Sequence, residues 1–143
     1  MDSLPGLQDA ARRVAGDQQF FIGGNHPDRR GCAGGSDVGF DAHGGQGCIS
    51  VASNVAPRLC AELQNATLAG DFRKALALQD TLMPLFEVLF IETNPAPVKY
   101  AAARIGLCGE EARLPMVPVS DATRAAVDAV LAKLGLIKAK AAE

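Results

Sequence analysis

The spacing of apolar residues predicts a helical second half of the chain. After residue 52, apolar side chains recur every three to four positions, as they do on one face of an α-helix. Ser53 is a favoured N-cap for a first helix, and Gly70 suits its end. The apolar face of this predicted helix consists of Val55, Leu59 and Leu63.

A second helix is predicted directly after Gly70. Asp71 is positioned to cap it, and Pro84 lies inside it and is expected to kink it, because proline lacks a backbone donor and clashes with the preceding turn. The residues expected to face inward are Phe72, Leu76, Met83, Phe86 and Phe90.

Two further helices complete this half. Asn94-Pro95 opens one that ends at Gly106, and Ser120 caps the other, which ends at Gly135. The first has Val98, Ala102 and Ile105 on its inner face, and the second has Ala126, Val127, Val130, Leu131 and Leu134. Residues 113–118 between them are expected to be extended.

The first 52 residues have a mixed pattern. A helix is predicted at 5–14, and two short apolar runs, Gln19–Ile22 and Cys48–Val51, are typical of buried strands next to glycines. The Gly-rich stretch 24–47 between them shows little periodicity. Strands followed only by helices predict an α/β fold, as at the end of a β/α barrel with a C-terminal helical cluster.

Composition narrows the class of protein. The chain has 143 residues, 48% of them hydrophobic, with a net charge of −2, so neither nucleic acid nor a membrane surface is an expected partner. No run approaches the roughly 20 apolar residues that span a bilayer, and the N-terminus shows no secretory signal, so a cytoplasmic location is expected. The four cysteines are widely spaced, which favours reduced and mostly buried thiols.

Four sequence blocks are informative when they are taken together. They are Gly44-Gly45-Gln46-Gly47-Cys48-Ile49-Ser50-Val51-Ala52-Ser53-Asn54-Val55-Ala56-Pro57, Leu82-Met83-Pro84-Leu85, Asn94-Pro95-Ala96-Pro97-Val98-Lys99 and Arg113-Leu114-Pro115-Met116-Val117-Pro118. In this order and spacing they resemble the C-terminal half of dihydrodipicolinate synthase, from about Ala42 to Leu136, and the last block indicates the synthase branch of that family.

The resemblance implies a partial TIM barrel, comprising its last two strands with their helices, followed by a helical domain. Residues 1–70 would be the barrel remnant and 71–143 the helical domain. Intact members of the family are lyases that condense pyruvate with an aldehyde, aspartate semialdehyde in the synthase, for lysine and diaminopimelate synthesis. They use a lysine Schiff base, need no metal or organic cofactor, and are commonly homotetramers.

Two residues carry over as substrate-binding positions. Ile49 matches the isoleucine whose backbone carbonyl faces the Schiff-base site, and Gly24 matches the glycine whose backbone lines the pyruvate pocket. Asp2-Ser3 fits the two positions that follow the catalytic lysine, which places Met1 where that lysine would stand. Residues 31–39 have no counterpart by this resemblance and are interpreted as an insertion or an out-of-frame stretch.

The Schiff-base lysine is therefore expected to be absent, and with it useful turnover by this chain alone. Imine chemistry needs a neutral amine held in a dry pocket. Lys99 is the only one of the five lysines inside a family block, and it is expected on a solvated helix surface. The other lysines are Lys74, Lys133, Lys138 and Lys140.

Other kinds of site remain as weaker interpretations. His26, Cys32, His43 and Cys48 fall in one segment, but their spacing is irregular for zinc. The glycine pairs at 34–35 and 44–47 lack the Lys-Ser/Thr ending of a phosphate loop. Asp71 and Asp121 are interpreted as cap residues, Glu110-Glu111 as a solvated turn, and Tyr100 as core or interface.

Two alternatives to a truncated synthase stay open. One is a non-catalytic helical fragment that associates with full-length subunits, and the other is part of another pyruvate-dependent aldolase of the N-acetylneuraminate lyase superfamily. In either case, barrel strands without their neighbours would expose unpaired edges, so a marginal fold that forms homo-oligomers or aggregates is expected.

Overall fold

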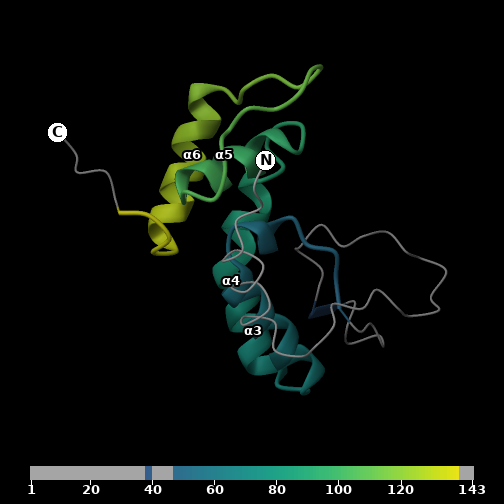
Figure 1. The fold of residues 1–143 in the computed structure, drawn as a ribbon. Helices are drawn as coiled ribbons and strands as arrows, with labels where there is room; N and C mark the ends of the chain where they lie inside the picture. The colour runs from purple at the N-terminus through teal and green to yellow at the C-terminus, as the bar shows by residue number, and fades with distance from the viewer. Residues whose placement is uncertain (1–37, 40–46, 139–143) are drawn as a thin grey trace.

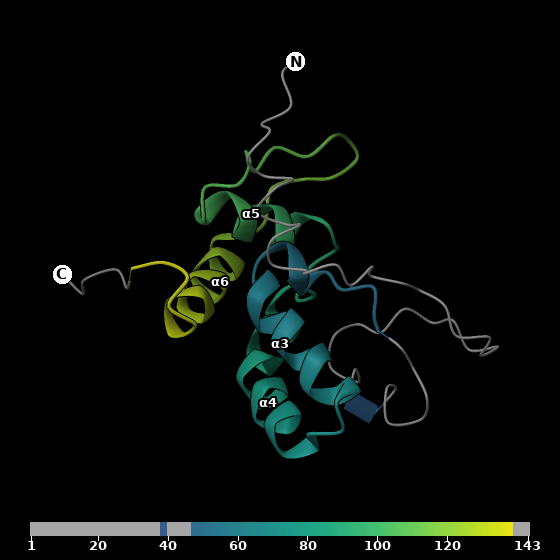
Figure 2. The same cartoon turned by 60° about the horizontal axis from the view of Figure 1, so that its bottom comes forward.

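The computed structural model describes residues 38–39 and 47–138, and helices dominate this part of the chain (Figure 1). The elements are η1 (Ala52–Asn54), α3 (Pro57–Leu68), α4 (Phe72–Val88), α5 (Ala96–Arg104) and α6 (Asp121–Lys133). The helices form two contacting pairs, α3 with α4 and α5 with α6, and α4 also contacts α6 (Figure 2). The long loop between α5 and α6 extends away from both pairs.

The α3–α4 pair is a helical hairpin whose turn follows from local chemistry. The turn contains Gly70, whose positive φ of 77° favours glycine. Asp71 then caps α4, because its side chain accepts a hydrogen bond from the Lys74 backbone N–H at 3.1 Å. The predicted end of the first helix and the predicted cap of the second are both confirmed.

The first predicted helix begins later than Ser53. Ser53 belongs to the 3-10 turn η1, and its hydroxyl donates to the Ser50 carbonyl at 2.7 Å instead of capping a helix. Helix α3 starts at Pro57, a residue whose fixed φ suits the first helical position. The prediction of Ser53 as a cap was wrong, because its hydroxyl bonds backward along the chain.

The face that α4 buries differs from the predicted one. Of the five residues expected to face inward, Phe86 is buried and Met83 half-buried, whereas Phe72, Leu76 and Phe90 are 43%, 51% and 44% exposed. The residues that α4 buries are instead Ala75, Leu82, Leu85, Phe86 and Val88. Two neighbouring apolar stripes share the helical period, and the period alone does not tell which one meets the other helices.

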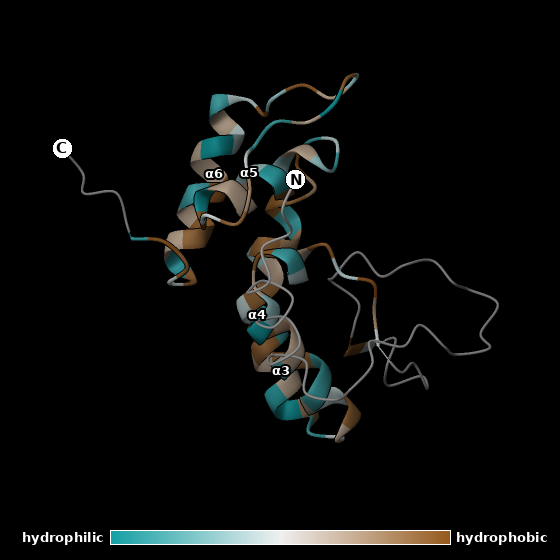
Figure 3. Cartoon of the chain, in the orientation of Figure 1, coloured by the Kyte–Doolittle hydropathy of each residue, from teal (hydrophilic) through white to brown (hydrophobic). Residues whose placement is uncertain are grey.

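The α5–α6 pair follows the prediction closely. Gly106 and Gly135 end the two helices with φ of 80° and 69°. Ser120 caps α6 by accepting from the Thr123 backbone N–H at 3.3 Å. Val127 and Leu131 of α6 are fully buried, and apolar and polar stretches alternate along the helices in Figure 3.

The predicted strand at Cys48–Val51 is not formed. Residues 47–50 have no regular secondary structure, and no strand occurs anywhere in the described ranges. A strand requires a hydrogen-bonded neighbour. Here the Val51 carbonyl instead accepts from the Asn54 backbone N–H at 3.1 Å, which draws the segment into η1. The predicted helix at 5–14 and strand at 19–22 lie outside the described residues.

The predicted division at residues 70 and 71 falls in the turn of the α3–α4 hairpin. The two helices on either side pack against each other, and the division of the chain at this point stays a prediction. Among the described residues, no helix combines the length and apolar character needed to cross a membrane.

Replacing Asp71 with alanine should destabilise the hairpin. The substitution removes the acceptor for the Lys74 N–H, and loss of such a cap costs about 1 kcal/mol of unfolding free energy. Asp71→Asn keeps an oxygen acceptor and should lose only a few tenths. Urea unfolding followed by circular dichroism measures both; equal stability of the two variants would show that the cap contributes nothing.

Candidate functional site

The segment from Gly47 to Val51 contains Ile49, a predicted substrate-binding residue. Gly47 adopts a positive φ of 144°, and the Ile49 side chain is 59% exposed. Cys48 is half-buried, and its sulfur accepts a hydrogen bond from the Gln64 side-chain amide of α3 at 3.3 Å. The segment is thus attached to α3 while Ile49 points outward.

A tight turn connects this segment to η1. The Ser53 N–H donates to the Ser50 hydroxyl at 3.2 Å, and the Asn54 side-chain amide donates to the Val51 carbonyl at 3.0 Å. Contacts of η1 with both α3 and α5 fix its position. The structure therefore brings η1, which belongs to the block at 44–57, next to α5, which begins within the block at 94–99.

The turn before α5 contains a buried polar group. The side-chain nitrogen Nδ2 of Asn94 is buried without a hydrogen-bond partner among the described residues, and the Asn94-Pro95 peptide is cis. Lys99, which was predicted on a solvated helix surface, lies one turn into α5 and is half-buried. Buried donors in folded proteins nearly always find an acceptor, so the Asn94 amide is a position to which a further group could bind.

The most extensive polar network joins α5 to α6. Asp128 accepts from Arg104 through Nε at 2.6 Å and Nη2 at 3.1 Å, and from the Tyr100 hydroxyl at 3.2 Å. Burial of Tyr100, reinforced by the Asp128 charge, raises the pKa of its phenol. Tyr100 and Arg104 both donate to the Asp128 carboxylate. The carboxylate therefore joins the two helices, and the arrangement is structural rather than that of a general acid or base.

The same network extends into the loop before α6. The Arg124 guanidinium lies 4.7 Å from the centre of the Tyr100 ring and binds the Glu110 carboxylate through two hydrogen bonds, at 2.8 and 3.1 Å. The hydrogen bond from Arg124 lowers the pKa of Glu110. Glu110 is exposed as predicted, but its interpretation as a merely solvated turn residue was wrong, because it anchors the loop. The interpretation of Tyr100 as a core residue is confirmed at 7% exposure.

Glu92 forms a second cap on α6. Its carboxylate accepts from the Ser120 hydroxyl at 2.7 Å and from the Ser120 backbone N–H at 3.1 Å. Hydrogen bonding from the Thr123 side chain, followed by these two Ser120 bonds, lowers the pKa of Glu92 below its ordinary value of 4.5. Since 28 residues separate Glu92 from Ser120, sequence spacing gave no signal for this pair.

The lowered pKa of Glu92 predicts acid sensitivity. A carboxylate whose folded-state pKa is depressed contributes stability above its unfolded pKa and loses it as the pH falls through the folded value. The unfolding free energy should therefore decline below about pH 4.5, and Glu92→Gln should decline less over the same range. Denaturant titrations at several pH values measure this. Glu87→Gln, at an exposed carboxylate of α4, serves as the control and should behave like the parent chain.

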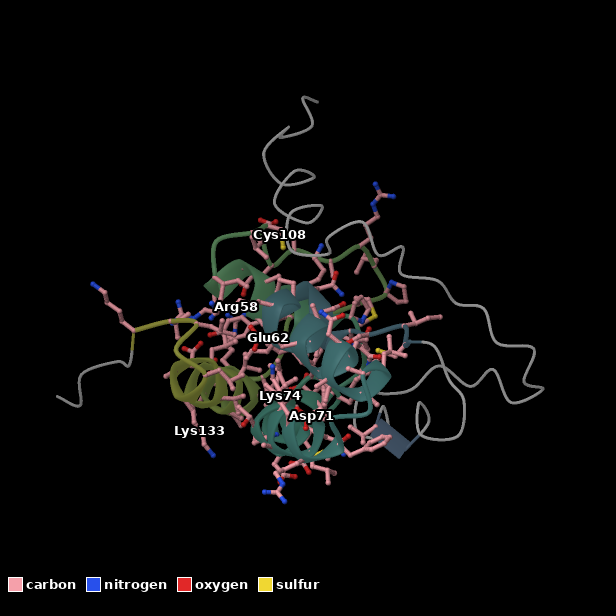
Figure 4. The ribbon with its side chains drawn as sticks, turned by 90° about the horizontal axis from the view of Figure 1, so that it is seen from below. Arg58, Glu62, Asp71, Lys74, Cys108 and Lys133 are labelled. Carbon is pink, nitrogen blue, oxygen red and sulfur yellow. The ribbon has the colours of Figure 1, made fainter. Side chains whose placement is uncertain are left out.

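Some of the residues considered for a substrate, metal or cap position lie within the described part of the chain. Gly24, His26, Cys32 and His43 lie outside the described residues, and within those residues no group of three or more His, Cys, Asp or Glu side chains is placed to hold a metal. Among the described cysteines, Cys48 is half-buried and Cys60 is buried, whereas Cys108 is exposed on the α5–α6 loop (Figure 4). Asp71 and Asp121 occupy the predicted cap and first-turn positions.

Comparison with known proteins identifies the family. The sequence matches the dihydrodipicolinate synthetase family over residues 34–134. The chain belongs to this family. The match begins eight residues before Ala42, so residues 34–39 of the stretch interpreted as an insertion or an out-of-frame reading fall inside it.

Individual relatives agree with the family assignment. The 4-hydroxy-tetrahydrodipicolinate synthase of Methylobacterium radiotolerans is 61% identical over 100 residues, which are 70% of this chain and 33% of the relative. The dihydrodipicolinate synthase structure from Thermotoga maritima superposes with a TM-score of 0.71 at 39% identity, covering 73% of this chain and 35% of that one. A chloride-inhibited Acinetobacter baumannii synthase solved with pyruvate gives a TM-score of 0.71 at 31% identity over 73% of this chain and 36% of that one.

These relatives are much longer than the matched region. The chain spans about a third of the length of the curated relative from M. radiotolerans. The resemblance to the dihydrodipicolinate synthase family is confirmed, and the helical model of this chain superposes on solved members of that family.

Proposed function

We propose that this chain is the C-terminal part of a dihydrodipicolinate synthase: the last barrel strands with their helices, and then the helical domain. The observation behind the proposal is the family match over residues 34–134, together with the packing of η1 against α5 that unites two family blocks. In the whole enzyme this part would contribute Ile49, and with it Gly24, to the wall of the pyruvate site. The condensation of pyruvate with aspartate semialdehyde would belong to that whole enzyme.

The chain alone should not catalyse this condensation. A Schiff-base nucleophile must be a neutral amine in a sheltered, fixed position. Lys74 and Lys133 are exposed near the start of α4 and the end of α6 (Figure 4), Lys138 is exposed, and Lys99 is half-buried on α5. These four positions are all on the helices or after them, and not on the segment that contains Ile49. Pyruvate bound to the A. baumannii relative supports pyruvate as the substrate of the whole enzyme.

A chimaera tests the proposal. The 100 residues of this chain that are 61% identical to the M. radiotolerans synthase would replace their counterparts in that enzyme. The chimaera should condense pyruvate with aspartate semialdehyde at a rate within about tenfold of its parent, because the parent supplies the remaining two-thirds of the fold. A folded chimaera without activity would contradict the proposal.

The isolated chain provides the complementary measurement. After incubation with pyruvate and borohydride, which reduces an imine to a stable amine, mass spectrometry should find no pyruvate adduct above that seen with unfolded chain. The intact M. radiotolerans enzyme is the positive control. A stoichiometric adduct on one lysine of this chain would show that it holds its own nucleophile, and the proposal of an incomplete catalyst would fail.

A further inference from the structure

Helix α3 buries a glutamine side chain. Gln64 is 7% exposed and shares the buried face of the helix with Cys60, Leu63 and Thr67. Glutamine is mostly found at protein surfaces, because burying an amide costs free energy unless a hydrogen bond compensates for it. A leucine of comparable size would fill this position without that cost, which indicates that the amide contributes something besides packing.

The Gln64 amide is bonded to the segment that contains Ile49. Its nitrogen Nε2 donates to the Cys48 sulfur at 3.3 Å, across 16 positions of the chain. The segment leaves η1 and runs beside α3 in both views (Figures 1 and 2). The residue before Cys48 is Gly47, which restrains the backbone little because it has no side chain. The bond from α3 therefore gives the segment a fixed starting point.

The position of Ile49 is set by its neighbours. Its own side chain is 59% exposed and contributes little packing. On the η1 side, the Ser50 hydroxyl accepts from the Ser53 N–H at 3.2 Å, and the Ser50 carbonyl accepts from the Ser53 hydroxyl at 2.7 Å. Ile49 thus lies between a local attachment at Ser50 and a long-range attachment from Gln64 to Cys48.

We propose that Gln64 is a positioning residue for the pyruvate site of the whole enzyme, where it holds the backbone of Ile49 in place through Cys48. This role follows from the one proposed above for Ile49, whose backbone carbonyl would face the Schiff-base site. Gln64 donates to Cys48 from the buried face of α3, so it acts on substrate only through the segment. Fixing a site residue before the substrate arrives strengthens binding, because the binding step then carries less of the ordering cost.

The pyruvate kinetics of the chimaera described above test the proposal. Gln64→Leu removes the donor and keeps an apolar side chain of similar size, and Cys48→Val removes the acceptor. Each should raise the KM for pyruvate about fivefold, the equivalent of one ordinary hydrogen bond, and leave kcat and the KM for aspartate semialdehyde within about twofold. The double variant should be no worse than either single one, because both remove the same bond. Cys48→Ser keeps an acceptor and should stay close to the unsubstituted chimaera.

Thr67→Val is the control for a purely structural effect. Thr67 is 5% exposed, and its hydroxyl donates to the Leu63 carbonyl at 2.8 Å, so this substitution also removes a buried hydrogen bond from α3. It should leave the KM for pyruvate unchanged even where it lowers stability. The proposal would be overturned by an unchanged KM in Gln64→Leu, by an equal rise in Thr67→Val, or by additive effects of Gln64→Leu and Cys48→Val.

A measurement on the full chain by itself separates failure of this proposal from failure of the proposed function. The NMR order parameter of the Ile49 amide should be about 0.85 in the parent chain, as in rigid backbone, and should fall towards roughly 0.6 in Gln64→Leu but not in Thr67→Val. Equal values in the parent chain and in Gln64→Leu would overturn the proposal whatever the chimaera does. An inactive chimaera together with the expected order parameters would contradict the proposed function, and with it the role in pyruvate binding, while supporting the attachment of the segment by Gln64.

Discussion

Leu82→Ala should lower the free energy of unfolding by about 3 kcal/mol, within the range of roughly 2–5 kcal/mol for buried leucines. Leu82 is fully buried in the middle of α4, the helix that contacts both α3 and α6. Alanine leaves a cavity there without changing helix propensity much, so the loss comes from packing. Since domains are stable by only about 5–15 kcal/mol, a substantial shift of the urea midpoint should follow.

Two further substitutions make this prediction specific to the orientation of α4. Leu114→Ala removes the same atoms from a side chain that is 90% exposed and should change stability by less than about 0.5 kcal/mol. Phe72→Ala, on the exposed stripe, should cost less than Leu82→Ala even though phenylalanine is larger. The opposite order would mean that α4 buries the Phe72 stripe, as the sequence pattern alone suggested.

The features that the sequence predicted well depend on local chemistry. Asp71 and Ser120 cap helices because their side-chain oxygens reach a backbone N–H three residues ahead. Gly70, Gly106 and Gly135 all adopt the positive φ that ends a helix at low cost. Each of these interactions is complete within four or five residues, so the residue types and their spacing are sufficient to predict it.

Features that depend on packing were predicted less well. The stripe that α4 buries is chosen by its contacts with α3 and α6, and the period of 3.6 residues is the same for both stripes. Similarly, Cys48–Val51 has the composition of a strand, but a strand forms only against a neighbour. In both cases the missing information concerns segments that are distant in sequence.

In the candidate site too, the features that depend on contacts between distant residues could not be predicted from the sequence pattern. Ile49 was selected through the family motif and lies on a segment fixed by Gln64 and η1, but no periodicity in the chain would have found it. The clamp around Asp128 joins residues that are 24 and 28 positions apart, so none of its pairs appears as a motif. The packing of α5 on α6 creates these pairs, and their chemistry is visible only once that packing is known.

Asp128→Ala should lower the unfolding free energy by about 1–2 kcal/mol, because one carboxylate serves both Arg104 and the buried Tyr100 hydroxyl. The Arg104 and Asp128 side chains are 41% and 30% exposed, so solvent weakens the ion pair and the effect stays below that of a core cavity. Asp128→Asn retains an acceptor oxygen and should lose less. Asp80→Ala, at an exposed carboxylate of α4, is the matched control and should be near neutral.

A double-mutant cycle and a pH series separate the two partners of Asp128. Arg104→Ala combined with Asp128→Ala should cost less than the sum of the single substitutions, since both remove the same bidentate pair. The raised pKa of Tyr100 means that the folded state favours the neutral phenol, so its contribution is complete below about pH 10 and is lost as the pH rises through the folded value. In Asp128→Ala this alkaline loss should be smaller, because one cause of the raised pKa is gone. Additive single substitutions together with an unchanged alkaline profile would show that the carboxylate does not couple α5 to α6, and that apolar packing alone joins the two helices.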